Sequence, residues 1–511
     1  MSTNQSKTPE QQINDLFESI DGLWSTSILE TFNEYITIKC ITPQYAKDSL
    51  PAICDALALA MKWVNKQSEI NATMIAGIPE GSPCKPFIEL STKPIDTAKL
   101  TPVLLVRIPG TAPKNSGNVL MYGHWDKQAV EGETWTEPKN NPNPGPFSPY
   151  VEDDHLYGRG TADDGYAFFI SIAAIMALNQ LNIPYPDVNF ILDFDEEGGS
   201  VNLETYLDKF KSEIGTPDLC ITLDSGAGDY KRIWNTTTER GTVTGTLSVQ
   251  VLTDNVHSGD GAGIIPDPQR IMRHILSRLE DPLTGEITPS VFKAEVPAVF
   301  LADVFSQATN IIPSIVKGFP WYKNATTVSN DPVQLILNRI WRAGLAITGI
   351  SGLPNNKNAN NVIIPQISYQ ISLRIPPSLD TIIAQKSLKE LFEKDPPYGA
   401  TIIYDYEGAP VGAGWMSPPQ PAWLSDAIDL VSQALFQQGA APLGDGGTVP
   451  VLNAFQKLFP KTLFFATGVA GPGNNEHAAN ENLNIRYAKQ LSSCLAFVIS
   501  EVVGNVQNTS S

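Results

Sequence analysis

The chain has 511 residues, 42% of them apolar, and a formal net charge of -19 at pH 7. One compact core rarely absorbs a chain of this length, so we expect two or more domains with real apolar cores. Nucleic-acid backbones and anionic membranes are bound through clustered Lys and Arg, so we expect this acidic chain to bind neither.

The N-terminus and the cysteines bear on where the protein works. The first ten residues are polar and lack the apolar core of a secretory signal. The best helical apolar run, over residues 167–181, is too short and too interrupted to span a bilayer. The cysteines are odd in number, scattered and without C-x-x-C spacing: Cys40, Cys54, Cys84, Cys220 and Cys494. We therefore expect a cytoplasmic protein whose cysteines are reduced core residues.

The first half of the chain alternates helices with short apolar strands. Apolar spacing predicts mostly helix over residues 13–64 and strands over 103–108 and 118–122. The Pro/Asn-rich stretch 137–150 cannot hold regular structure, because its prolines remove backbone donors, so we expect a surface loop over or beside a site. A helix over 164–181 and a further strand follow. This alternation predicts an α/β fold with a mostly parallel sheet.

The pattern changes after Arg240. Residues 242–252 alternate polar and apolar side chains, which is typical of an antiparallel sheet with one solvated face. We expect a second, smaller α+β domain here, with a helix over 268–279 and a strand over 364–375. The expected divisions are 1–240 for the first part of the main domain, 241–410 for the inserted domain and 411–511 for the second part of the main domain.

Candidate metal ligands stand at the ends of predicted buried strands. His124 ends one apolar run, Glu196 and Glu197 end a second, and Asp224 ends a third. Ligands of α/β folds bind at the carboxyl edge of the sheet, so we expect these side chains to meet there.

Histidine and carboxylate side chains in this number fit a two-metal hydrolase. Such a site needs a carboxylate shared by two metals and a general base beside the attacking water. Asp163, in a pair with Asp164, and His477 are the further candidates. This donor set favours two Zn²⁺ ions, with Mn²⁺ or Co²⁺ as alternatives at an oxygen-rich site.

The order of these motifs resembles the M20 family of metallopeptidases, most closely its carnosinase-like dipeptidases. The resemblance extends from about residue 118 to 477 and implies a mostly parallel-sheet zinc-peptidase catalytic domain with an inserted lid domain. The matching segments are His124-x-Asp126, Y-G-R-G-T-A-D-D at 157–164, E-E-G-G-S at 196–200, Asp224, H-S-G at 257–259 and G-G-T-x-P at 446–450.

The resemblance also implies a division of the metal ligands. Asp163 would bridge both metals, and the peptide bond that follows it would be cis. His124 and Asp224 would complete one metal site, whereas Glu197 and His477 would complete the other.

Catalytic roles follow from the same resemblance. Glu196 would be the general base that takes a proton from water and delivers it to the leaving amine. Asp126 would orient the imidazole of His124. His257, on the lid, would stabilise the oxyanion, often from the partner subunit of a homodimer formed through the lid domain.

Substrate contacts are implied for a small peptide. Arg374 would hold the substrate carboxylate, because its fork of N–H donors suits that planar group. Asp445 would pair with a substrate amine. Weaker matches for backbone and terminal contacts are Asn361, Gly447 and Thr448.

The chain departs from the family pattern where Gly165-Tyr166 follows the paired aspartates in place of Lys-Gly, which leaves the substrate preference open. We expect metal-dependent hydrolysis of dipeptides or short peptides. The alternatives are an N-acyl amino acid deacylase or carboxypeptidase of the same superfamily, and a non-catalytic binding protein that kept the fold.

Overall fold

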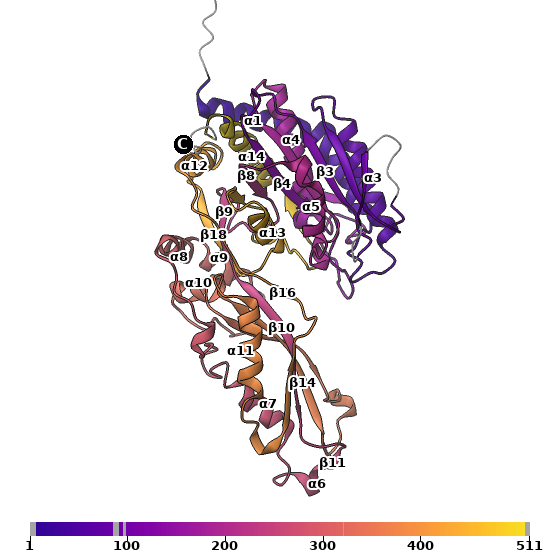
Figure 1. Cartoon of the computed structure of the whole chain (residues 1–511), viewed down its shortest axis with the longest axis vertical. Helices are drawn as coiled ribbons and strands as arrows, with labels where there is room; N and C mark the ends of the chain where they lie inside the picture. Colours follow the sequence, from indigo (N-terminus) through magenta and orange to yellow (C-terminus); the bar gives the residue numbers. More distant parts are fainter. Residues whose placement is uncertain (1–6, 85–90, 96–98, 320, 506–511) are drawn as a thin grey trace, which may run out of the picture. The chain divides into compact units, whose positions relative to one another are not determined.

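The computed structural model describes residues 7–84, 91–95, 99–319 and 321–505. The chain forms two compact units, which Figure 1 shows coloured along the sequence. The first comprises Met1–Thr237, Ser417–Leu443 and Pro450–Ser511, and the second comprises Thr238–Met416 and Gly444–Val449. Two of these boundaries fall within a few residues of the expected divisions. The short return of the chain to the second unit at Gly444–Val449 was not expected.

The first unit carries an α/β sheet with helices on both faces. Its helices are α1 (Pro9–Leu23), α2 (Leu29–Thr37), α3 (Leu50–Asn65), α4 (Tyr166–Gln180), α5 (Leu203–Ile214), α12 (Ala422–Phe436), α13 (Pro450–Leu458) and α14 (Ile485–Asn505). Its main-sheet strands are β1 (Thr73–Pro79), β2 (Ser91–Ile95), β3 (Val103–Ile108), β4 (Asn118–His124), β7 (Asp187–Asp193), β8 (Leu219–Thr222), β9 (Trp234–Glu239), β18 (Ala441–Asp445) and β19 (Leu463–Ala466).

The strand order of this sheet is β17-β9-β19-β8-β4-β7-β3-β1-β2, with β18 also paired to β9; its end strand β17 (Trp415–Met416) falls in the residue range of the second unit. The central strands β19, β8, β4 and β7 run parallel to one another. β3, β1 and β9 are added antiparallel at the flanks. The predicted strands and the mostly parallel sheet are therefore confirmed. A separate small sheet, in the order β20-β6-β5, joins β5 (Tyr150–Glu152), β6 (His155–Tyr157) and β20 (Asn482–Asn484).

Neighbouring residues of β4 show which helices cover each face of the sheet. Tyr122 packs edge-on against Phe455 of α13, which itself contacts α5. On the opposite face, a Cβ on Gly123 would lie 2.7 Å from the Cβ of Ala167 in α4. Glycine is thus required at this position because α4 runs so close to the strand. α4 is further covered by α1 and α14.

The helix α4 is apolar on all sides, and its residues from Tyr166 to Leu178 are buried. By length and composition, the stretch Thr161–Gln180 could cross a membrane, but 94% of its most apolar window is buried inside the protein. A helix that is hydrophobic all round is either a core element or a membrane span, and burial identifies this one as a core element.

The second unit is built on an antiparallel sheet in the order β12-β14-β10-β15, with β16 paired to β10. Side chains of β10 alternate between buried and partly exposed, as the sequence pattern predicts. The helices α7 and α11 pack on this sheet, and α8, α9 and α10 contact one another. The strands are β10 (Gly241–Gln250), β11 (Val256–His257), β12 (Gly344–Ser351), β13 (Val362–Ile363), β14 (Gln366–Ile375), β15 (Thr401–Asp405), β16 (Val411–Gly412) and β17 (Trp415–Met416). The helices are α6 (Ser258–Gly261), α7 (Pro268–Leu276), α8 (Ala298–Asn310), α9 (Ile312–Gly318), α10 (Pro332–Ile340) and α11 (Thr381–Glu393).

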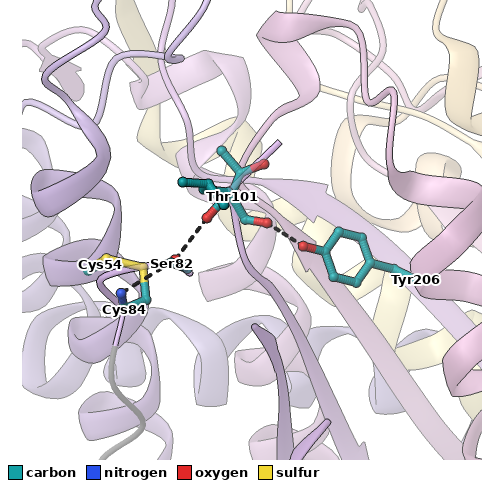
Figure 2. The surroundings of a disulfide bond; sticks show 6 residues. Cys54, Ser82, Cys84, Thr101 and Tyr206 are labelled. Carbon is teal, nitrogen blue, oxygen red and sulfur yellow. Dashed lines mark hydrogen bonds between the residues drawn. A yellow bond between two sulfur atoms is a disulfide. The ribbon is translucent and has the colours of Figure 1, made fainter. Parts of the chain in front are cut away.

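The cysteine prediction was wrong for one pair. Cys54 in α3 and Cys84 beyond β1 form a disulfide, with their Cα atoms 4.9 Å apart. Figure 2 shows this bond beside Ser82, whose hydroxyl accepts a hydrogen bond from the backbone N–H of Cys84. The two cysteines are 30 residues apart in the sequence, and only folding brings the segment after β1 next to α3. The spacing of the cysteines alone therefore did not predict the disulfide. Cys40, Cys220 and Cys494 are free and buried, as expected.

The Pro/Asn-rich stretch from Glu137 to Tyr150 is irregular up to β5, as predicted. It runs beside the loop that carries His477. The side-chain oxygen of Asn480 in that loop accepts hydrogen bonds from the backbone N–H groups of Thr136, at 2.8 Å, and Glu137, at 2.9 Å.

Candidate metal centre

The predicted ligands gather at the carboxyl edge of the central parallel strands. His124 is the last residue of β4. Glu196 and Glu197 follow the end of β7, and Asp224 follows the end of β8. His477 lies in the loop between β19 and β20. Because parallel strands end at the same edge, three separate turns place their side chains around one point.

Asp163 lies at the centre of this group. Its Oδ1 is 3.0 Å from Nε2 of His124, and its Oδ2 is 2.8 Å from Nε2 of His477. Nε2 of His477 is also 3.2 Å from Oε2 of Glu197, and Nε2 of His124 is 3.9 Å from Oδ2 of Asp224. One carboxylate thus faces two histidines, one through each oxygen.

The donor atoms fall into two groups that suit divalent metal ions. Their ligand atoms lie within 4.8 Å of one another in each group, and Asp163 belongs to both. The first group is His124, Asp163 and Asp224, and the second is Asp163, Glu197 and His477. Oε1 of Glu197 is buried without a hydrogen-bond partner, so this member of the second group keeps a free acceptor. Imidazole nitrogen and carboxylate oxygen are the ligands of catalytic zinc sites, so the residues fit such an ion.

Crowded acids make the metal-free site electrostatically unfavourable. Burial, with the nearby Asp163 charge, raises the pKa of Glu197 to about 8. Burial raises the pKa of Asp224 to about 6. Burial lowers the pKa of His477, but hydrogen bonds to Asp163 and Glu197 outweigh it and raise that pKa to about 12. A bound divalent cation would stabilise the charged form of these carboxylates and so counteract the rise in the pKa of Glu197 and Asp224.

Asp126 contacts both the turn of Glu196 and Glu197 and the imidazole of His124. Its two carboxylate oxygens each accept a hydrogen bond of 3.0 Å, one from the backbone N–H of Glu196 and one from that of Glu197. Its Oδ1 lies 3.3 Å from Nδ1 of His124. Asp126 and His124 are both fully buried. A carboxylate on Nδ1 directs Nε2 toward a metal, so this placement fits the orienting role inferred for Asp126.

Glu196 stands beside the first group of donors. Its Oε2 is 3.9 Å from Nε2 of His124, and its side chain is 15% exposed. Burial, with the neighbouring Asp224 charge, raises the pKa of Glu196 well above its usual value. Glu196 lies next to the donors but belongs to neither metal group.

Two buried acids at the site received no role from the sequence. Oδ2 of Asp164 accepts a hydrogen bond of 3.2 Å from the backbone N–H of His124. The peptide bond between Asp163 and Asp164 is cis, as the resemblance implied. Glu481 is fully buried and accepts hydrogen bonds from the loop that leads to Asp163. The available signal was its position four residues after His477.

The predicted substrate residues lie in the second unit, in two separate places. At one end of β14, Arg374 approaches the hydroxyl of Thr448 at 3.5 Å. The Oδ1 of Asp445 accepts a hydrogen bond of 3.0 Å from the backbone N–H of Gly447 and lies 3.7 Å from the Arg339 guanidinium. These four predicted residues are therefore close in the fold.

His257 and Asn361 lie near the other end of β14, where β11 and β13 form a separate two-stranded sheet. His257 ends β11, where it is paired with Val362 of β13, and its side chain is 66% exposed. Its Nδ1 accepts a hydrogen bond of 3.2 Å from the backbone N–H of Gly259. Asn361 is exposed, and its backbone carbonyl accepts a hydrogen bond from Ser258. β10 and β14 separate this pair from Arg374.

Comparisons with known proteins agree with this geometry. The family model for Peptidase family M20/M25/M40 matches residues 120–501. A human Beta-Ala-His dipeptidase is 23% identical over 93% of this chain and 90% of its own length. A Cys-Gly metallodipeptidase of Candida albicans is 26% identical over 78% of this chain and 81% of its own length.

The crystal structure of human carnosine dipeptidase 1 has a similar fold. It superimposes with a TM-score of 0.73 at 20% identity, covering 96% of this chain and 99% of that one. The family match covers most of the chain and includes every predicted metal ligand. The chain therefore belongs to Peptidase family M20/M25/M40 and is a metallopeptidase.

Proposed function

We propose that this chain is a dipeptidase that hydrolyses the amide bond of dipeptides or short peptides with two metal ions held on Asp163. The observation that carries the proposal is the position of Asp163, with one carboxylate oxygen facing His124 and the other facing His477. Relatives that cover most of the chain are named as dipeptidases, which supports the substrate class.

Zinc is the proposed metal because each donor group combines an imidazole nitrogen with carboxylate oxygens, and Mn²⁺ and Co²⁺ are the alternatives. Such ions supply Lewis-acid activation of the scissile carbonyl and of water. The chain's own part is to hold His124 in one orientation through Asp126 and to keep the glutamate turn fixed by the same carboxylate.

Glu196 is the proposed general base. Its carboxylate would take a proton from the attacking water and deliver it to the leaving amine. The turn that carries it is held by Asp126, which fixes the backbone beneath the side chain. Burial raises the pKa of Glu196, which makes its carboxylate a stronger base toward water.

Arg374 is the proposed partner of the substrate carboxylate. Burial lowers the pKa of this guanidinium, but the side chain stays cationic, since arginine deprotonates only at very high pH. Thr448 and Gly447 are the further proposed contacts. The Thr448 hydroxyl lies beside Arg374, and the backbone N–H of Gly447 is donated to Asp445, so a substrate would have to displace that bond.

The amine contact is less well supported than the carboxylate contact. Asp445 lies beside Arg339 and accepts the N–H of Gly447, so part of its charge is already engaged. This observation favours the N-acyl amino acid deacylase as the second candidate, because its substrates have no free amine for an acid to bind.

His257 would act on the partner's substrate in a homodimer. A strand of ten residues separates the Arg374 end of the sheet from the His257 end, and such a strand is ~30 Å long. A dipeptide spans at most ~7 Å. One substrate molecule therefore cannot contact both side chains of the same chain, whereas two chains could supply one each.

A mixed-dimer experiment tests this arrangement. Glu196→Gln and His257→Ala protomers are each expected to be inactive as homodimers. Mixed dimers should regain part of the activity, because one of their two sites combines a working Glu196 with a working His257. If subunit exchange is demonstrated and activity stays absent, His257 does not act across the dimer.

The cytoplasm is the proposed location. The Cys54–Cys84 disulfide is the observation against it, because disulfides persist mainly in oxidising compartments. Counting free thiols in protein isolated under alkylating conditions shows whether Cys54 and Cys84 are reduced, as expected in the cytoplasm, or joined in a disulfide.

The decisive test of function is metal analysis of the purified protein followed by a substrate screen. Dipeptides should be hydrolysed faster than their N-acetylated counterparts, and a chelator should remove the activity. Preference for the N-acetylated series would replace the dipeptidase by the deacylase. A protein that binds no divalent metal and cleaves neither series would be a binding protein on the same fold.

A further inference from the structure

We infer that Glu481 is a positioning residue that fixes the loop of Asp163 against the loop of His477 and thereby sets the geometry of both metal groups. The inference rests on the proposed metal site. Glu481 itself belongs to neither donor group, so its role differs from that of a ligand.

The carboxylate of Glu481 gathers backbone donors from one short loop. Its Oε2 accepts the N–H of Gly160 at 3.0 Å, and its Oε1 accepts those of Ala162 at 3.0 Å and Asp163 at 3.3 Å. The last of these donors is the backbone of the shared ligand itself. A side chain that holds three N–H groups of one loop leaves that loop little freedom to move.

Backbone pairing ties the same two loops together. The backbone carbonyl of Glu481 accepts the N–H of Gly158 at 3.0 Å. Asn482, the next residue, is paired with Tyr157 where β20 meets β6. The β20–β6 pairing and this backbone bond already hold the two loops together, and the Glu481 side chain adds hydrogen bonds closer to Asp163.

The buried charge of Glu481 is balanced by an arginine. Nη1 of Arg159 donates to Oε2 of Glu481 at 2.8 Å, and Nη2 of Arg159 donates to Glu133. Arg159 is 1% exposed, and Glu481 is fully buried. A carboxylate in such a place is tolerated only when it is paired and hydrogen-bonded, and these contacts meet that condition.

The chemistry of the contact requires glutamate. Glutamine keeps one carbonyl oxygen, but its NH₂ group would face backbone N–H groups and the Arg159 guanidinium, which are all donors. Aspartate keeps the charge, but its carboxylate stops about 1.5 Å short, the length of one C–C bond. Both changes should make the loop of Asp163 more mobile, although neither replaces a metal-ligating residue.

The experiment compares Glu481→Gln and Glu481→Asp with Glu133→Gln as the matched control. Glu133 pairs with the side chain of the same Arg159, whereas the backbone N–H groups of residues 160, 162 and 163 are donated to Glu481. Zinc affinity is measured by competition with a chelating dye, and the electronic spectrum of the Co²⁺-loaded protein reports the ligand geometry. Circular dichroism and thermal unfolding verify that each variant is folded.

The two Glu481 variants should bind metal ~10–100-fold more weakly than wild type, the usual cost of removing a group that supports a ligand. Their cobalt spectra should also change. The Glu133→Gln variant should keep the wild-type affinity and spectrum even if it unfolds at a lower temperature. Folded Glu481 variants with wild-type affinity and spectrum would overturn the inference, as would an equal loss of affinity in Glu133→Gln.

A measurement on the unaltered chain decides the matter if the Glu481 variants do not fold. Hydrogen exchange of the metal-free protein should show slow exchange for the amides of residues 160, 162 and 163. Exchange of these amides at unfolded-chain rates would overturn the inference. A wild-type protein that binds no metal would instead contradict the proposed function, so the two failures are distinguishable.

Discussion

In the first unit, the ligand side chains other than His477 are at most 19% exposed, whereas the predicted substrate residues of the second unit are partly or fully exposed. The side chain of His477 is itself 52% exposed. His124 and Asp126 have no exposed surface, and Asp126 alone accepts two backbone N–H groups. In the second unit, the His257 side chain is 66% exposed, and its Nδ1 accepts a bond from a neighbouring turn. Hydrogen bonds hold the ligand edge, where the geometry of bond breaking matters. The predicted substrate residues stay accessible to solvent, from which substrates enter.

The largest expected effect comes from the centre of the buried edge. Asp163→Ala should abolish activity and lower the occupancy of both metals, because Asp163 belongs to both donor groups. His477→Ala is the matched variant, since it removes a donor from one group alone. Metal content per chain by mass spectrometry distinguishes them, and equal loss in both variants would argue against a shared Asp163.

The next largest effect separates chemistry from metal binding within that edge. Glu196→Gln should keep its metals but slow turnover by ~10²–10⁴-fold, because the amide cannot accept the proton. Stopped-flow or steady-state kcat with metal content measured on the same sample checks this. A kcat near that of wild type would mean that another group is the base.

A smaller effect is expected from the second unit. Arg374→Ala should raise KM for dipeptides by ~10–100-fold, the cost of a hydrogen bond to a charged group, with less change in kcat. C-terminally amidated dipeptides provide the control, because they lack the carboxylate. If Arg374→Ala weakens amidated and free dipeptides equally, the arginine does not bind that carboxylate.

No effect on the chemistry is expected from the disulfide. Cys54→Ser should lower the free energy of unfolding by ~2–4 kcal/mol, as loss of a native disulfide commonly does, and leave kcat/KM unchanged. The Cys54→Ser/Cys84→Ser double variant should lose no more than the single one. A loss of kcat/KM would show that this region supports the site.

That the candidate ligands would meet at one edge of the sheet could be predicted because its signals are local. His124 and Asp224 each follow an apolar run, and parallel strands bring such ends together without any knowledge of the loops. The core helix was also visible from its apolar run, although the length of Thr161–Gln180 alone does not exclude a membrane span.

The features that the sequence missed depend on contacts between distant segments. Cys54 and Cys84 meet because β1 returns the chain to α3. The role of Glu481 depends on hydrogen bonds from backbone N–H groups some 320 residues earlier in the chain, which its local sequence does not indicate. The return of residues 444–449 to the second unit likewise follows from the course of β18, which pairs with β9. None of these contacts leaves a periodic or compositional trace.

Anomalous diffraction from zinc-loaded crystals tests the central claim most directly. The account predicts two anomalous peaks per chain on either side of the Asp163 carboxylate, each about 2.0–2.2 Å from one of its oxygens. One peak should also contact His124 and Asp224, and the other Glu197 and His477. A single peak, or two peaks that do not share Asp163, would contradict it.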